Sequence, residues 1–402
     1  MSKQLLFPRL GEPNHRFLIK KVISGLFCRK FVLGSIRISK KRMTTLAIDS
    51  TPRHSSLWLK SPRWDLTWVS LSVLLMFVPY STYYLGRAIG FNPDLARNTV
   101  NTIIAFAIGG PHMYATYTRT LLEPKFRRRY WTIIPMAIII PSLVIYSAIF
   151  HFTYLLTFFF FWASIHVLHQ IIFIVDCYNE RQRSLLTKYS RTIDYAVVLS
   201  ALYPMAMYKF THNTFTVGQQ VLYFPEFLKV DIVWWLASGI FAISFILYIA
   251  KTIREFQLGI GNIPKTILIT VTILATFFTP FFHELDVAFQ GLNSWHSFQY
   301  LGLTWYINRL RYDRGEISNP AVRRLSEPGK WYRFYGFTML AALTAISVIG
   351  LLILTQQYHH LTFDQCYYMV ILCFLLTHYF HDHILFTQSQ EIRTEWKDEK
   401  AF

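Results

Sequence analysis

Residues 152–174 read FTYLLTFFFFWASIHVLHQIIFI, a stretch of 23 residues without a charged side chain. A helix needs about 20 predominantly apolar residues to cross the hydrocarbon core of a bilayer, so this stretch predicts a membrane-spanning helix. The same stretch contains His166 and His169, whose imidazoles are costly to place in hydrocarbon. It therefore indicates both the class of fold and the position of a candidate site.

The composition of the whole chain is that of a membrane protein. The 402 residues are 53% hydrophobic and 17% aromatic, and only 15% are charged, against about 25% in a typical soluble domain. Ten segments approach or reach the length and apolarity of a span, namely 66–85, 98–118, 131–150, 152–174, 194–208, 231–250, 267–282, 285–307, 334–354 and 366–386. We predict an all-α fold, a multi-pass transmembrane helical bundle of about ten spans.

The distribution of Lys and Arg indicates how this bundle is oriented. The connections on one side, together with the C-terminal tail, hold 22 of the 40 Lys and Arg residues, whereas the other side holds Arg87, Arg97, Lys209 and Lys229. Because cytoplasmic loops carry the excess of Lys and Arg, both termini are predicted to be cytoplasmic. The net charge of +18 thus reports topology. A nucleic-acid-binding protein gathers its cations on a water-facing surface, so we expect membrane lipid and no nucleic acid as a partner.

The other basic residues lie in the N-terminal segment 1–64, which is expected to be disordered. Residues 1–42 contain eleven Lys and Arg and one acidic residue, Glu12. Three interpretations stay open: a start codon placed too far upstream, with Met43 as the true first residue, an organelle presequence, or a basic segment that lies on anionic lipid. A bacterial inner membrane is the favoured location, and an organelle membrane follows if a presequence is present. The chain thus divides into the segment 1–64, a transmembrane domain at 65–388 and a cytoplasmic tail at 389–402.

Histidine is the ionisable residue that recurs in the predicted spans. Eight of the fourteen histidines lie in the spans or at their edges, namely His112, His166, His169, His283, His296, His378, His381 and His383. Ionisable groups inside a bilayer mark candidate functional sites, and neutral imidazole is a common ligand of redox metals. We leave the roles of His283 and His378 open, and we predict that an intramembrane metal is bound by His112, His166, His169, His296, His381 and His383.

The sequence around these histidines favours convergence on one point. Two glycines and Pro111 precede His112, so the helix is expected to kink or open there and to turn the imidazole inward. His166 and His169 are three residues apart and share a helix face, and Asp176 follows on that face. The side chains predicted to orient the imidazoles by hydrogen bonds are Asp176, Asp382 and Tyr300.

The depth of the histidines in the membrane gives a second argument. His296 precedes Arg309 by thirteen residues and His169 precedes Arg181 by twelve, which at about 1.5 Å per residue places both about 20 Å from the cytoplasmic edge. In the last span, the side chains of residues two apart point about 200° apart around the helix. His378, His381 and His383 therefore cannot all be ligands of one metal.

The available ligands indicate the chemistry. Carboxylate-bridged di-iron sites need several Glu or Asp, and the spans contain few. A histidine-dominated site fits iron, with copper, zinc or haem as alternatives. A site among apolar side chains can receive a hydrophobic substrate directly from the bilayer, where oxygen is also concentrated. We therefore predict a metal-dependent oxygenase or oxidoreductase that acts on a lipid or isoprenoid-like substrate.

Four short patches resemble the Brp/Blh family of bacterial membrane dioxygenases, which cleave β-carotene to retinal. The patches are Gly110-Pro111-His112, Ile165-His166 with Asp176, Trp295-His296-Ser297 and His381-Asp382-His383-Ile384-Leu385. That family places single histidines on several transmembrane helices around a non-haem iron. The resemblance implies a helical membrane fold and an iron site held by these histidines.

Other classes of protein also use intramembrane histidines. The membrane desaturase and hydroxylase family carries HxxxH and HxxHH boxes, which this chain lacks, and a bis-histidine haem protein would need only two facing imidazoles. A transporter or assembly protein that uses the histidines as a proton or ion path is the alternative from a different class. The kink expected before His112 and the break between the seventh and eighth spans are typical of the discontinuous helices of transporters.

Overall fold

The computed structural model describes residues 57–212, 215–218, 220–282, 284–355 and 360–387. All of these residues belong to one compact unit of the chain, Thr51–Phe402. The predictions made for residues 1–42, for the tail at 389–402 and for His283 lie outside the described residues.

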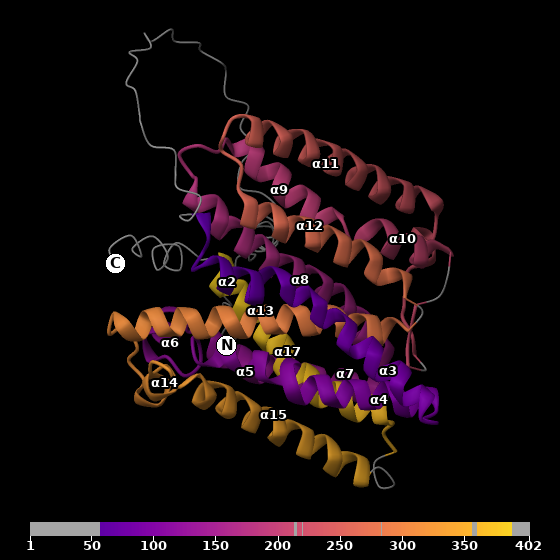
Figure 1. Cartoon of the computed structure of the whole chain (residues 1–402). Helices are drawn as coiled ribbons and strands as arrows, with labels where there is room; N and C mark the ends of the chain where they lie inside the picture. The colour runs from indigo at the N-terminus through magenta and orange to yellow at the C-terminus, as the bar shows by residue number, and fades with distance from the viewer. Residues whose placement is uncertain (1–56, 213–214, 219, 283, 356–359, 388–402) are drawn as a thin grey trace, which may run out of the picture. The chain divides into compact units, whose positions relative to one another are not determined.

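The described residues are almost entirely helical, as the all-α prediction requires (Figure 1). The helices are α2 (Pro62–Trp64), η2 (Asp65–Ser70), η3 (Leu71–Met76), α3 (Phe77–Ala88), α4 (Pro93–Ile104), η4 (Ala105–Gly109), α5 (Gly110–Tyr117), α6 (Pro124–Arg129), α7 (Ile133–Phe150), α8 (Phe152–Arg181), α9 (Lys188–Ser200), α10 (Tyr203–His212), η5 (Glu226–Leu228), α11 (Asp231–Gln257), α12 (Ile263–Phe278), η6 (Thr279–Phe281), α13 (Leu285–Asp313), α14 (Pro320–Leu325), α15 (Trp331–Leu354) and α17 (Phe363–Thr387). Two short strands, β1 (Thr216–Val217) and β2 (Gln220–Val221), pair antiparallel with Thr216 opposite Val221.

Seven helices in the described part of the chain are long and apolar enough to cross a membrane. They are Pro62–Ala88, Ile133–Phe150, Phe152–Arg181, Asp231–Gln257, Ile263–Phe281, Trp331–Leu354 and Phe363–Thr387, and each coincides with a predicted span. The other predicted spans, 98–118, 194–208 and 285–307, fall on the run α4–η4–α5, on the pair α9 and α10, and on α13. These helices indicate an integral membrane protein, while the count of ten spans and the cytoplasmic termini stay predictions.

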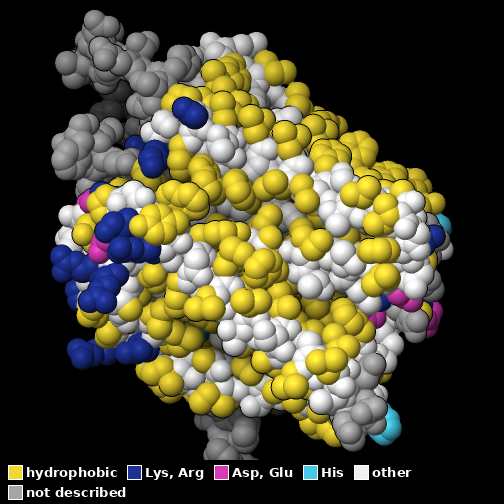
Figure 2. Space-filling view, turned by 60° about the horizontal axis from the view of Figure 1, so that its bottom comes forward, with side chains coloured by type: hydrophobic (Ala, Val, Ile, Leu, Met, Phe, Trp, Pro, Cys, Tyr) yellow, Lys and Arg dark blue, Asp and Glu magenta, His cyan; other side chains and the backbone are white. Residues whose placement is uncertain are grey.

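The surface of the bundle is apolar along its length and basic at one end. Large apolar side chains such as Ile138, Ile246 and Leu340 are well over half exposed on α7, α11 and α15. Figure 2 shows hydrophobic side chains across the face in view and Lys and Arg gathered at its left edge. We call this the basic end, where the exposed Arg128, Arg129, Arg323 and Arg324 close α6 and α14. Exposed apolar area of this extent requires an apolar surrounding, which the bilayer supplies.

The inner helices are the ones that carry polar side chains at depth. Helices α8, α13 and α17 pass through the middle of the bundle in Figure 1, with α11 above and α15 below. Their buried residues include the largest fully buried side chains, Trp295, Tyr178 and Phe159. Helix α5 packs against α13, α15 and α17. The core thus consists of the helices on which the predicted histidines lie.

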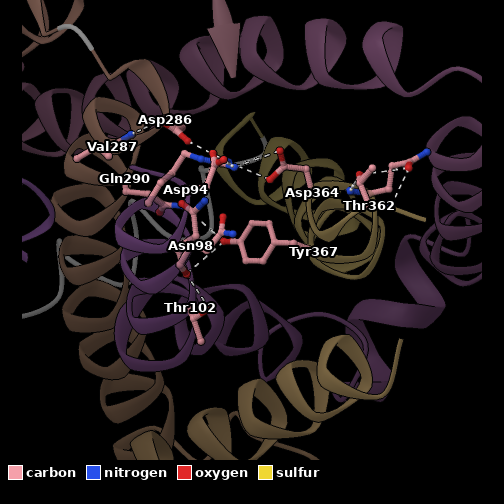
Figure 3. A network of polar contacts seen from close by, with 12 residues as sticks. Asp94, Asn98, Thr102, Asp286, Val287, Gln290, Thr362, Asp364 and Tyr367 are labelled. Atoms are coloured by element: carbon pink, nitrogen blue, oxygen red, sulfur yellow. Dashed lines mark hydrogen bonds and ion pairs between the residues drawn. The ribbon is translucent and has the colours of Figure 1, made fainter. Parts of the chain in front are cut away.

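An ion-pair cluster joins α4, α13 and α17 (Figure 3). The buried guanidinium of Arg97 on α4 lies 2.9 Å from Asp364 on α17 and 3.3 Å from Asp286 on α13. Gly218 covers the cluster in a left-handed conformation, with φ +57°, and a Cβ at this position would lie 2.3 Å from Asp364 Oδ2. Because removing one partner of a buried ion pair costs about 3–5 kcal/mol, this cluster holds the relative positions of α4, α13 and α17.

Candidate metal centre

Four buried histidines from four different helices come together in the core. They are His112 on α5, His166 on α8, His296 on α13 and His378 on α17, and one ring nitrogen of each lies within 4.8 Å of the others. No side chain of the four is more than 5% exposed. The ring centroids of His112 and His378 are 4.6 Å apart, and those of His166 and His296 are 4.9 Å apart. This arrangement is the candidate metal centre.

A π-helical turn positions His112. The turn η4 ends at Gly109, two residues before Pro111, so the irregularity predicted before His112 is present. Nδ1 of His112 lies 2.5 Å from the carbonyl oxygen of Gly109 and 2.9 Å from Oγ of Ser297. A carbonyl only accepts, so Nδ1 carries the proton and donates it. Nε2 then keeps its lone pair, faces the other histidines and has no hydrogen-bond partner.

The other three rings are held by their helices and by stacking. His166 stacks on Tyr379 with 3.9 Å between the centroids. His378 Nδ1 lies 2.6 Å from Oγ1 of Thr116, which leaves its Nε2 free for a ligand. The main-chain carbonyl of His296 accepts a hydrogen bond of 3.1 Å from the Gln170 side chain. Each ring therefore presents at least one nitrogen without a hydrogen-bond partner to the centre.

A polar layer formed by Thr116, Tyr300 and Asp382 lies against the histidines. Oδ1 of Asp382 accepts a hydrogen bond of 2.7 Å from the hydroxyl of Tyr300 and one of 3.1 Å from Thr116. Oδ2 of Asp382 has no hydrogen-bond partner and lies 3.5 Å from Nε2 of His378 and 3.9 Å from Nε2 of His166. A carboxylate is thus held next to two of the five unpartnered ring nitrogens of the four histidines.

The unpartnered atoms show what the centre is suited to bind. They are Nε2 of His112, His166 and His378, both ring nitrogens of His296, and Oδ2 of Asp382. A buried polar atom without a partner costs about 1–3 kcal/mol, so several at one point call for a bound group. Four neutral imidazoles beside one carboxylate form a donor set for a divalent transition metal. The four-histidine group could therefore hold a metal ion.

The structure brings together part of the predicted ligand set and adds one residue. His112, His166 and His296 belong to the group, and His378, whose role the sequence left open, is its fourth member. Asp382 and Tyr300 lie in the polar layer, where they were predicted to orient the imidazoles.

Three of the predicted ligands, His169, His381 and His383, lie outside the group. His169 is half-buried, and its ring lies 5.8 Å from the ring of His383, which is exposed. His381 points away from the group toward the turn after α5, where its Nδ1 lies 3.1 Å from Thr120 Oγ1. The reason is the helical period, because neighbours three residues apart diverge by about 60° around the axis. In this bundle only His166 of the pair on α8, and only His378 of the pair on α17, belongs to the group between the four helices.

Asp176 also lies away from the group. Its carboxylate accepts a hydrogen bond of 2.5 Å from the hydroxyl of Tyr195 on α9. It follows His166 by ten residues on α8, which is about 15 Å along the helix axis. Asp176 therefore joins two helices and does not orient an imidazole of the group.

One spacing in the sequence would have found the residues that were missed. Thr116 follows His112 by four residues, Tyr300 follows His296 by four, and Asp382 follows His378 by four. Residues four apart lie on one helix face, so three helices carry the same histidine-plus-polar pair. Thr116 was not predicted, and His378 would have been chosen over His381 on this criterion.

No family model, no curated protein and no solved structure matches this chain.

Proposed function

We propose that this protein is an integral-membrane, metal-dependent oxygenase or oxidoreductase that acts on a hydrophobic, lipid-like or isoprenoid-like substrate. The observation that carries the proposal is the convergence of four buried imidazoles, each with an unpartnered nitrogen, in the core of an apolar helical bundle. Iron is the metal we propose, and copper, zinc and haem are the alternatives. A bacterial inner membrane is the location we favour.

The donor set supports a redox metal over a purely structural one. Structural zinc sites are most often built from Cys, or from Cys with His, whereas all four nitrogen donors here are imidazoles and Asp382 is the adjacent carboxylate. Bound iron would supply the one-electron chemistry that oxygenation requires. The chain would hold it with His112, His166, His296 and His378, while Thr116 and Tyr300 keep the Asp382 carboxylate and the His378 ring in place.

A large apolar cavity supports a hydrophobic substrate. A space of about 690 Å³ lies beside η4 and α13, the elements that carry Gly109 and His296, and its aromatic walls include Trp64, Trp68, Trp305 and Trp331. A cavity of this volume is in the range of small-molecule sites. The cavity has few polar groups. Lys60 lines it, and the hydroxyl of Tyr335 donates a hydrogen bond to the carbonyl of Ala107.

The resemblance to the carotene-cleaving dioxygenases agrees with this proposal. Three of the patches that carry it, Gly110-Pro111-His112, Ile165-His166 and Trp295-His296-Ser297, supply members of the histidine group. Cleavage of a long conjugated isoprenoid would be one form of the proposed reaction. The carotenoid itself is an expectation from the resemblance.

Metal analysis tests the proposal. The protein is purified in lipid nanodiscs, and its metals are measured by plasma mass spectrometry. We expect stoichiometric iron in the unmodified protein and loss of the metal in His112→Ala and His296→Ala, with His383→Ala as the matched control that keeps it. Substoichiometric iron, copper and zinc that do not change in these variants would overturn the proposal.

A second candidate, a proton or ion path through the histidines, is favoured by one chain of hydrogen bonds. Ser297 donates to Asn293 at 3.0 Å, Asn293 donates to Gln290 at 3.1 Å, and Gln290 donates to Asn101 at 2.9 Å. This chain runs from His112 toward the ion-pair cluster of Arg97. Proton flux in liposomes that disappears in His166→Ala and survives in His169→Ala would favour this function over the oxygenase.

A further inference from the structure

A second, smaller cavity lies among α8, α10, α13 and η6. Its volume is about 90 Å³, and its walls include Phe160, Ala163, Ala206, Phe289 and Leu292. A cavity of about 150 Å³ lined by Leu, Ile and Phe stays dry and takes benzene or xenon. The present cavity is smaller still, so it has room for a molecule of two or three heavy atoms. We call this cavity the chamber.

The lining of this cavity offers water almost nothing to bind. Three hydroxyl groups occur among its lining residues, those of Ser164, Tyr203 and Thr279. Ser164 donates to the carbonyl of Phe161 at 2.8 Å, Thr279 donates to the carbonyl of Ala275 at 2.6 Å, and Tyr203 is hydrogen-bonded with Ser164. A buried water needs two to four polar partners. The chamber is therefore expected to be dry.

Helical register places this chamber beside the metal centre. Ala163 precedes His166 by three residues on α8, and Leu292 precedes His296 by four on α13. Side chains three or four apart are neighbours on a helix, with about 5–6 Å between their Cβ atoms. Two independent helices thus put the chamber about one turn from two of the four histidines.

We propose that this chamber is a binding site for dioxygen next to the histidine centre. The inference rests on the proposed oxygenase function and names the class of its second substrate. Dioxygen is apolar, dissolves in the hydrocarbon around the bundle and fits a dry space of about 90 Å³. The larger cavity of about 690 Å³, beside η4 and α13, has the room for the lipid-like substrate.

The first experiment needs no metal. The metal-free protein in nanodiscs carries ¹³C-methyl methionine, and methyl relaxation is measured by NMR under increasing oxygen pressure. Met207 lines the chamber, whereas Met113 is fully buried on α5 and does not line it. We expect oxygen to enhance the relaxation of Met207 more than that of Met113. Equal enhancement at both methyls would overturn the proposal.

Variants that fill the chamber make the test specific. Ala163→Leu and Ala206→Leu fill it from two different helices, and Ala250→Leu is the matched control on an exposed face of α11. We expect both filling variants to abolish the excess relaxation of Met207 and the control to keep it. Because the two fillers start from different elements, agreement between them excludes a local packing defect.

The second experiment separates this proposal from the function on which it rests. The Fe²⁺-loaded proteins are mixed with oxygenated buffer in a stopped-flow instrument. We expect the filling variants to bind as much iron as the unmodified protein and to react with oxygen several-fold more slowly, with Ala250→Leu unchanged. Normal iron with unchanged oxygen rates overturns the dioxygen site alone, whereas a chain that binds no iron overturns the oxygenase and the dioxygen site together.

Discussion

His378 and His381 lie three residues apart on α17, and only His378 reaches the other three histidines. His378 is also held by Thr116, whereas His381 contacts Tyr117 at the end of α5 and Thr120 in the turn that follows. A rotation of about 60° around α17 thus separates His378, which joins the group, from His381, which lies beside it. At the scale of single residues, this rotation decides which side chains belong to the centre.

His378 and His381 provide a direct prediction about metal binding. We expect His378→Ala to reduce bound iron to background, because one of four converging nitrogens is lost, and we expect His381→Ala to keep the metal. Bound iron per chain is measured after equal purification of both variants. Equal loss in both would show that the metal does not lie among the four histidines.

Asp382 is expected to tune the affinity of the centre. Its Oδ2 lies 3.5 Å from Nε2 of His378, and its Oδ1 is held by Tyr300. Asp382→Asn keeps the shape of the side chain and removes the negative charge, so we expect the affinity for Fe²⁺ to fall about 10- to 100-fold, as for other residues that support metal ligands. Competition with a chelator measures the affinity.

The control for Asp382 is a carboxylate far from the centre. Asp94 is more than half exposed beside Arg97, so Asp94→Asn should leave the affinity unchanged. Unchanged affinity in Asp382→Asn as well would show that this carboxylate takes no part in metal binding.

At the scale of elements, the turn η4 and the start of α5 determine how closely α15 approaches. A Cβ on Gly110 would lie 2.7 Å from Cβ of Ala342 on α15 and 2.3 Å from the carbonyl oxygen of Ala105. Glycine at this position therefore allows α15 to pack directly over the turn that tethers His112. The π-helical turn and the ring position of His112 are thus coupled through packing.

Gly110→Ala tests this coupling. We expect the variant to lose about 1–3 kcal/mol of stability, as overpacked cores do, and to bind Fe²⁺ more weakly because Gly109 and His112 shift together. Thermal unfolding and metal competition measure the two effects. Gly350→Ala on α15 is the matched control, since a Cβ there meets no atom within 4 Å, and a similar loss in both would contradict the argument.

At the scale of the whole molecule, the distribution of charge over the apolar helical bundle predicts its orientation in the membrane. The exposed cations Arg128, Arg129, Arg323 and Arg324 gather at the basic end, while Arg97 is buried against acidic partners. Exposed cations resist transfer across a bilayer, so the basic end is expected to face the cytoplasm.

Labelling of single cysteines tests this orientation. In a background without the native cysteines, Arg324→Cys lies at the basic end, and Phe227→Cys lies on the connection before α11, where the side chain is 77% exposed. We expect a membrane-impermeant maleimide to label Phe227→Cys in intact bacterial cells and to label Arg324→Cys only after lysis. Labelling of both in intact cells would exclude the predicted topology.

The fold class was predictable because it depends on local properties. Apolar runs such as 152–174 and 334–354 are long enough to span by themselves, and they became α8 and α15. The predicted spans 98–118 and 285–307 contain more polar residues because α5 and α13 face the centre and not lipid, and these helices fall below the apolarity of the other seven. The polar residues that lower the apolarity of these two spans thus include members of the candidate site.

The sequence by itself determined the position of each histidine along its helix and the apolar stretch in which that histidine lies. What only the tertiary structure decided was the direction of each side chain around its helix axis. The direction of the side chain distinguishes His166 from His169 and His378 from His381. Direction depends on how α5, α8, α13 and α17 pack, and contacts such as the one between Arg97 and Asp364 set that packing across more than 260 residues of sequence. No local pattern contains a constraint of that range.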